Sequence, residues 1–122
     1  MCTIVHSLPV LTSKFREARN YRIANGKSPF EEWFKNLKDV AGKARVAVRI
    51  ERAEKGNFGT YRDLKDGLFE LKDLFGPGYR VYFGLDKGEL IILLVGGSKR
   101  SQSRDIAKAR NYLADYLRRT KE

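Results

Sequence analysis

The strongest candidates for chemistry in this sequence are four basic residues, Lys72, Arg80, Lys99 and Arg100. Each of them lies in or directly beside a segment with the composition of a β-strand. Basic side chains held at fixed positions along a sheet attract phosphate groups, and an arginine can bind two phosphate oxygens at once. Their placement predicts a binding site for RNA or DNA, with ordinary charges on a sheet surface as the alternative.

A predicted β-hairpin brings two of these cations together. Its strands are Leu68–Lys72 and Tyr79–Leu85, and the Gly-Pro-Gly turn between them requires a positive φ angle at a glycine. Pairing across this turn places Lys72 near Arg80, which shares its face of the strand with Tyr82. Because two neighbouring cations repel each other, this arrangement favours a bound anion.

The next predicted strand, Leu90–Val95, leads directly into the remaining cations. Its nearly uniform apolar composition is typical of a strand that is covered on both faces. The glycine pair Gly96-Gly97 follows and leaves room for the backbone of a ligand to come close. Lys99 and Arg100 come next, so a ligand at this strand end would meet both cations.

Residues 1–18 show no periodicity and are expected to form an irregular arm, followed by a short strand at Asn20–Ala24. A helix then begins with Ser28 as its N-cap and Pro29 at its first position, and Glu31 completes a capping box. The apolar face of this helix consists of Phe30, Trp33, Phe34 and Leu37, which we interpret as core residues.

A second helix is predicted between Asp39, its N-cap, and Gly56. Arg45, Arg49 and Arg52 form a basic ridge along it, on the side opposite to its buried stripe. By default such a ridge is a solvated helix face. The alternatives are a surface that follows phosphates and a docking site for an acidic partner. The expected buried stripe consists of Val46, Ala47, Ile50 and Ala53.

A last helix is predicted over Arg104–Arg119, with Ile106, Ala109, Leu113 and Leu117 as its buried stripe. These elements together predict one α+β domain over residues 19–119. In it, an N-terminal strand and two helices pack on an antiparallel β-sheet, and a C-terminal helix follows. The helices are expected on one face of the sheet, which leaves the other face free for a ligand.

The composition is that of a soluble and strongly basic globular protein. The 122 residues include 25 Lys and Arg against 15 Asp and Glu, a net charge of +10. This excess attracts anionic partners, unless it only keeps the surface soluble. Cys2 is the single cysteine and rules out an internal disulfide, which favours the reducing cytoplasm. His6 is the single histidine, and the sequence predicts no metal, no cofactor and no membrane association.

Several ordered motifs carry a resemblance to a known family. They are Phe-Glu-Leu-Lys from Phe69, Gly-Pro-Gly-Tyr-Arg-Val-Tyr-Phe from Gly76, Leu-Leu-Val-Gly-Gly-Ser-Lys-Arg-Ser-Gln from Leu93, Lys-Ser-Pro-Phe-Glu-Glu-Trp-Phe from Lys27 and Glu-Lys-Gly-Asn-Phe-Gly from Glu54. They resemble motifs of the RelE/HigB superfamily of toxins, and most of all its branch called addiction module killer proteins. The resemblance covers residues 19–119.

This resemblance implies a RelE/ParE-like fold and the toxin of a type II toxin–antitoxin module, a plasmid stabilization system. Such a toxin is a cytoplasmic, ribosome-associated mRNA endonuclease, or mRNA interferase, and it inhibits translation. The 2′-hydroxyl of the RNA attacks the adjacent phosphate without a metal ion, and a helix-turn-helix (HigA-like) antitoxin neutralises the enzyme. Two alternatives stay open: a ParE-like, non-catalytic toxin that inhibits DNA gyrase, and a non-toxic remnant that binds nucleic acid.

The resemblance also suggests roles for single residues. Two positions depart from the family's pattern: Glu70 stands where the ribosome-dependent nuclease has a lysine, and the position of its C-terminal tyrosine falls at about Ile106. Tyr82 and Tyr61 are the candidate substitutes for that tyrosine. The expected catalytic residues are Arg80, Lys99 and Lys72. The expected RNA-binding residues are Arg100, Gln102, Tyr82, Arg62 and Arg104, and the expected antitoxin-binding residues are Arg45, Arg49 and Arg52.

Overall fold

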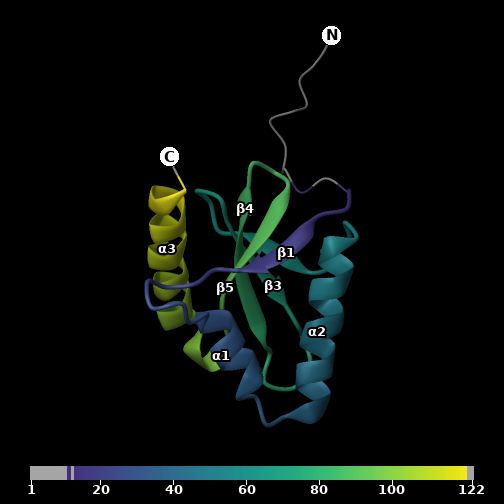
Figure 1. The fold of residues 1–122 in the computed structure, drawn as a ribbon. Coiled ribbons are helices and arrows are strands. Elements are labelled where there is room, and N and C mark those ends of the chain that lie inside the picture. Colours follow the sequence, from purple (N-terminus) through teal and green to yellow (C-terminus); the bar gives the residue numbers. More distant parts are fainter. Residues whose placement is uncertain (1–10, 12, 121–122) are drawn as a thin grey trace.

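The computed structural model describes residue 11 and residues 13–120, and it has an α+β fold (Figure 1). Cys2 and His6 therefore lie outside the described residues, as does most of the expected arm. The elements follow in the order β1 (Glu17–Asn20), α1 (Pro29–Lys35), α2 (Val40–Glu54), β2 (Tyr61–Asp63), β3 (Leu68–Lys72), β4 (Arg80–Asp86), β5 (Leu90–Gly97), the 3-10 turn η2 (Lys99–Ser101) and α3 (Gln102–Arg119).

The five strands form one sheet in the order β1-β5-β4-β3-β2. The hairpin pairing of β3, β4 and β5 is antiparallel, as predicted. The expectation of a wholly antiparallel sheet is wrong, because β1 joins the edge of the sheet parallel to β5, with Glu17 opposite Leu90. This strand also begins at Glu17 rather than at Asn20, so it takes in residues that we assigned to the arm.

The predicted N-caps of α1 and α2 are confirmed. The Ser28 hydroxyl accepts a hydrogen bond from the Glu31 backbone N–H at the start of α1, at 3.0 Å. At the start of α2, Asp39 accepts one from the Gly42 N–H at 2.9 Å. These contacts satisfy backbone donors that have no partner within the helix. Beyond the end of α2, Gly56 has a φ angle of +92°, which explains why a glycine stands there.

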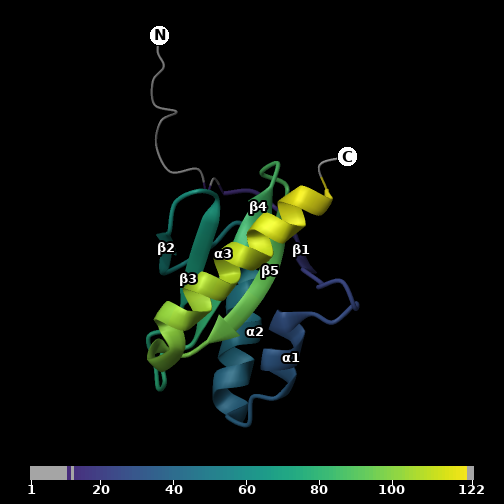
Figure 2. The ribbon, with the colours of Figure 1, turned by 90° about the vertical axis from the view of Figure 1, so that its left-hand side faces the viewer.

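Helices cover both faces of the sheet, which corrects the expectation of one free face. In Figure 2, α3 crosses in front of β3, β4 and β5, whereas α2 lies behind them. Alternate residues of β4 accordingly enter two separate cores: Val81 and Phe83 pack on the α1 and α2 side, and Tyr82 packs on the α3 side. The face that carries Glu70, Arg80 and Tyr82 is therefore buried under α3.

α3 starts at Gln102, two residues earlier than predicted, and its buried residues only partly follow the predicted stripe. Ala109 and Leu113 are buried and Ile106 partly so, but Leu117 is 47% exposed and Asp105 is buried instead. Near the far end of the helix, the Tyr21 hydroxyl donates a hydrogen bond to Asp115 at 2.6 Å. Arg119 and then Tyr21 lower the pKa of Asp115 to about 2, so a charged carboxylate holds α3 to the segment after β1.

No helix among the described residues combines the length and the apolar composition that crossing a membrane requires.

Candidate nucleic-acid interface

Three of the four candidate cations converge where the β3–β4 turn meets η2. Lys72 is the cross-strand partner of Arg80, as predicted. Arg80 Nη1 and Lys99 Cβ lie 2.8 and 3.5 Å from the point where a β-carbon on Gly78 would be. The Lys99 N–H also donates to the Pro77 carbonyl at 3.2 Å, which ties η2 to the turn. We call Lys72, Arg80, Lys99 and Arg100 the strand-end cluster.

The members of the strand-end cluster differ in exposure. Lys99 and Arg100 are exposed, and Lys72 is half-buried. Arg80 is only 6% exposed, so the expectation of a sheet-surface arginine is wrong: its side chain lies between the turn at Gly78 and the buried Glu70. Its Nη1 donates to the Gly78 carbonyl at 2.6 Å, while Nε is buried and has no hydrogen-bond partner among the described residues. The guanidinium is therefore held in place between the Gly78 carbonyl and the Glu70 carboxylate.

A fully buried carboxylate, Glu70, organises the region beside Arg80. Arg62 Nε and Gln102 Nε2 donate to it at 3.1 and 2.9 Å, and Arg80 Nε lies 3.8 Å from its Oε2 atom. Glu70 thereby joins β2, β4 and the first residue of α3. Its negative charge also offsets part of the repulsion between Lys72 and Arg80, so this pair of cations does not depend on a bound anion for stability.

Neither tyrosine that we considered as a proton-transfer group lies in a suitable place. The Tyr82 side chain is fully buried, and within the part of the chain that the structure describes its hydroxyl has no hydrogen-bond partner. Burial first and the Glu70 carboxylate second raise the pKa of Tyr82, which keeps the hydroxyl neutral. Tyr61 packs against Phe58 and Phe69 in the core on the α1 and α2 side, on the opposite face from Arg80.

The glycine pair at the end of β5 allows close packing within the protein, a role that we did not expect. A β-carbon on Gly96 would lie 2.3 Å from the Trp33 ring, and one on Gly97 would lie 1.8 Å from Asp105 Oδ2. Larger residues would displace α1 or α3. The two glycines therefore let a tryptophan and a carboxylate lie directly against opposite faces of one strand.

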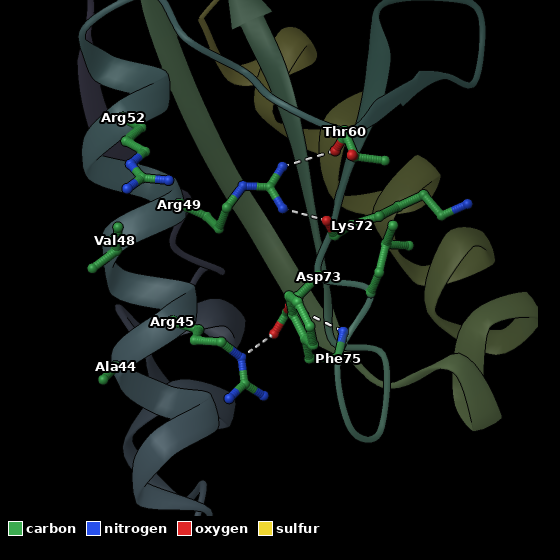
Figure 3. Close-up of a pocket in the computed structure, with 10 residues that line it drawn as sticks. Ala44, Arg45, Val48, Arg49, Arg52, Thr60, Lys72, Asp73 and Phe75 are labelled. Carbon is green, nitrogen blue, oxygen red and sulfur yellow. Dashed lines mark hydrogen bonds and ion pairs between the residues drawn. The ribbon is translucent and has the colours of Figure 1, made fainter.

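The three arginines of α2 do not form a ridge on the outer side of the helix. Figure 3 shows Arg45 and Arg49 directed towards the end of β3. Arg45 Nε lies 2.9 Å from Asp73 Oδ2. Arg49 donates to the carbonyls of Phe58 and Thr60 at 2.9 and 2.8 Å, and also to the Lys72 carbonyl.

Burial lowers the pKa of Arg49, whose hydrogen bonds bind the loop before β2 and the end of β3 to α2. Within the predicted stripe of α2, Val46 and Ala53 are buried, but Ala47 is exposed. Arg49 faces the protein for a simple geometric reason. Positions 42, 46, 49 and 53 share one side of the helix, and the long Arg49 side chain reaches the carbonyls from that side.

A groove of about 440 Å³ lies between α2 and the residues that follow β3 (Figure 3). It is lined by apolar side chains that are unusually exposed, Val48 at 40% and both Leu74 and Phe75 at 69%. Arg45, Arg49, Arg52 and Lys72 also line it, against one carboxylate, that of Asp73. We call this the α2 groove. Lys72 contributes its backbone to the groove, while its side chain points away from α2 in Figure 3.

A second hollow, of about 480 Å³, separates α1 from the first turns of α3. Arg104 lines this hollow, so the structure places Arg104 apart from the other predicted RNA-binding residues. Arg62, Tyr82 and Gln102, by contrast, surround Glu70, and Arg100 belongs to η2. We call this second hollow the α1–α3 cleft.

Comparison with known proteins identifies a relative of this chain. An uncharacterized protein of Haemophilus influenzae is 44% identical to it over 81 residues, which make up 66% of this chain and 82% of the Haemophilus protein. The chain belongs to the same family as that protein. No protein-family model matches the chain.

Three residues of these sites were not predicted as site residues, because their sequence signals were absent or had a more common explanation. Glu70 stood out only as a departure from a motif, and Asp105 carried no signal of its own in the sequence. Trp33 was interpreted as core, although it also lines the α1–α3 cleft. The one signal that could have located the cleft is Gly96-Gly97, because a glycine pair in a strand indicates close packing on both faces.

Proposed function

We propose that this protein is a toxin of the RelE/HigB superfamily and acts in the cytoplasm as a ribosome-associated mRNA endonuclease. The observation that carries the proposal is the strand-end cluster, in which Lys72 and Arg80 are cross-strand partners and Lys99 lies against the same turn. The residues that follow, Arg100 and those of α3, extend the positive charge from this point. The motif resemblance over residues 19–119 and the α+β fold support the same assignment.

In the proposed reaction, the 2′-oxygen of the RNA forms a bond to the adjacent phosphorus, and the bond from phosphorus to the 5′-oxygen breaks. The 2′-hydroxyl loses its proton, the leaving oxygen gains one, and the products are a 2′,3′-cyclic phosphate and a 5′-hydroxyl. Negative charge accumulates on the phosphate oxygens in the transition state. Arg80 and Lys99 stabilise this charge, and Lys72 assists them, because preorganised cations lower the barrier without having to reorganise.

One observation favours the alternative of a non-catalytic toxin that binds DNA gyrase: neither Tyr82 nor Tyr61 is placed for proton transfer. Induction of the protein in a bacterial host, with separate labelling of protein and DNA synthesis, distinguishes the two functions. The endonuclease should stop amino-acid incorporation first, with cleaved mRNA visible by primer extension, while DNA synthesis continues. An early stop in DNA synthesis with intact mRNA would instead support the gyrase inhibitor.

We further propose that the α2 groove binds the antitoxin of the module. Exposed Leu74 and Phe75 beside arginines match the composition of protein interfaces, in which aromatic residues and arginine carry much of the binding energy. The net positive charge of the groove fits an acidic segment of the helix-turn-helix antitoxin. Arg49 is a structural member of the groove, since its donors are occupied by carbonyls, whereas Arg52 is exposed and available to a partner.

Co-expression with the neighbouring open reading frame tests this partner. The double variant Phe75→Ala/Arg52→Glu should weaken the complex by at least about tenfold, since it removes an interface aromatic and reverses a charge. The exposed Arg118 on α3 provides a control, because Arg118→Glu changes charge away from the groove. If both variants bind the antitoxin like the native protein, the groove is not its docking site.

A further inference from the structure

The α1–α3 cleft combines aromatic rings, cations and a buried carboxylate in one hollow. Its volume of about 480 Å³ falls in the range of small-molecule sites. The lining includes Trp33 from α1, Gly97 and Ser98 after β5, and Arg104, Asp105, Lys108 and Tyr112 from the first turns of α3. The proposed reaction gives this set of residues no role, apart from Arg104 as a contact for RNA.

The aromatic rings of the cleft are fixed by their neighbours. Trp33 lies against Gly96, and the rings of Tyr79 and Phe30 hold it with centroid distances of 5.8 and 5.9 Å. Tyr112 packs against Tyr21 at a centroid distance of 5.2 Å. Rings fixed in this way stack on a flat ligand without losing much side-chain entropy, and stacking on aromatic rings is a common way of binding nucleobases.

Two cations line the same cleft. Arg104 and Lys108 are four residues apart on α3 and therefore lie one helical turn from each other on the same side. Both are exposed, and neither forms an ion pair with a carboxylate of the described residues. The pair is thus available to an anionic group, and a phosphate suits its charge.

Asp105 lines the cleft and provides a hydrogen-bond acceptor. Its side chain is nearly buried, at 5% exposure, and the Ser101 hydroxyl donates to Oδ2 at 2.5 Å. No described cation pairs with this carboxylate. A carboxylate accepts hydrogen bonds only, so it favours a ligand that presents N–H donors. The amino group of a nucleobase is such a donor, and aspartate is a recognised acceptor for base amino groups.

We propose that the α1–α3 cleft binds a nucleotide whose base carries an amino group. The base stacks on Trp33 and Tyr112 and donates to Asp105, and Arg104 and Lys108 hold the phosphate. This inference rests on the proposed function in one respect, namely that the nucleotide is part of the RNA strand. Gly97 lines the cleft and is the cross-strand partner of Arg80, so a strand that leaves the cleft reaches the strand-end cluster directly.

Trp33 is the single tryptophan of the chain, so its fluorescence reports on the cleft. Titration of the full chain with AMP should quench the emission in a saturable way, and UMP should bind about tenfold more weakly, because uracil lacks the amino group for Asp105. Lys108→Ala should weaken AMP binding several-fold, and Asp105→Asn should remove the preference for AMP over UMP. The matched control on the same helix is Arg118→Ala, which should bind AMP like the native protein.

A trinucleotide of 2′-deoxyadenosine, which cannot be cleaved by the proposed reaction, tests whether the nucleotide belongs to a strand. Lys99→Ala should weaken the binding of this trinucleotide but leave AMP binding unchanged. Equal affinities of Lys99→Ala and native protein for the trinucleotide would assign the cleft to free nucleotides and overturn the link to RNA. No quenching by any nucleotide, or quenching that Lys108→Ala leaves intact, would overturn the site. These experiments measure binding, so they test the cleft even if the protein proves not to cleave RNA.

Discussion

Replacement of Arg80 by alanine is expected to slow RNA cleavage by about 10²- to 10³-fold, the usual effect of removing one preorganised contact to a charged transition state. The burial of Arg80 beside Glu70 adds a second effect. Without the guanidinium, Glu70 keeps Arg62 and Gln102 but loses its nearest buried cation, so the free energy of unfolding should fall by about 3 kcal/mol. Loss of toxicity in this variant alone therefore does not distinguish catalysis from folding.

The double variant Glu70→Gln/Arg80→Ala separates the two effects. Glutamine has nearly the shape of Glu70 but no charge, so the double variant should recover much of the stability in urea unfolding and still lack cleavage. Arg80→Lys keeps a point charge without the planar fork and should retain partial activity. Native-like cleavage by the double variant would show that Arg80 stabilises the fold and does not act on the phosphate.

An RNA that carries a single 2′-deoxy sugar at the scissile position is expected to bind normally and to give no product. The proposed nucleophile is the 2′-oxygen of that sugar, so its removal takes away the reacting group and leaves the phosphate contacts intact. The same RNA with the deoxy sugar one nucleotide further on serves as the control and should be cut at the native rate. Gel analysis of both substrates on programmed ribosomes measures the difference.

The products of the control substrate provide a second check on the mechanism. They should carry a 2′,3′-cyclic phosphate and a 5′-hydroxyl, which phosphatase and kinase treatment identify. Binding of both RNAs should weaken steeply with salt, since each phosphate contact made by lysine or arginine releases counterions. Cleavage at the deoxy position would exclude attack by the 2′-oxygen, whatever the toxicity of the protein.

Features of the fold that depend on neighbouring residues could be predicted from the sequence. The caps of α1 and α2 and the pairing of Lys72 with Arg80 across the Gly-Pro-Gly turn are of this kind. Each depends on a few adjacent side chains or on the geometry of a short turn, which the order of residues determines directly. The same holds for β5, whose apolar composition indicated a strand covered on both faces.

Features that depend on distant segments could not be predicted in this way. Polar residues on alternate positions of β3 and β4 indicated a solvated face, yet Glu70, Arg80 and Tyr82 are buried under α3 because Arg62 and Gln102 satisfy the carboxylate from other elements. An alternating pattern shows which side chains are polar. It does not show whether distant residues form the hydrogen bonds that allow those side chains to be buried. Arg45 and Arg49 of α2 were misplaced for the same reason, since their partners lie on the loops around β2 and β3.

The parallel pairing of β1 with β5 determines when the sheet can close. Glu17 and Leu90 are neighbours in the sheet although most of the domain separates them in sequence, so the sheet closes only after β5 has been made. Contacts of such long sequence separation form slowly, because the intervening chain must first lose its freedom. Lys99 and Arg100 also follow β5, so the strand-end cluster is complete only after these residues have been made. The last cations of the cluster therefore join an already paired β3–β4 hairpin.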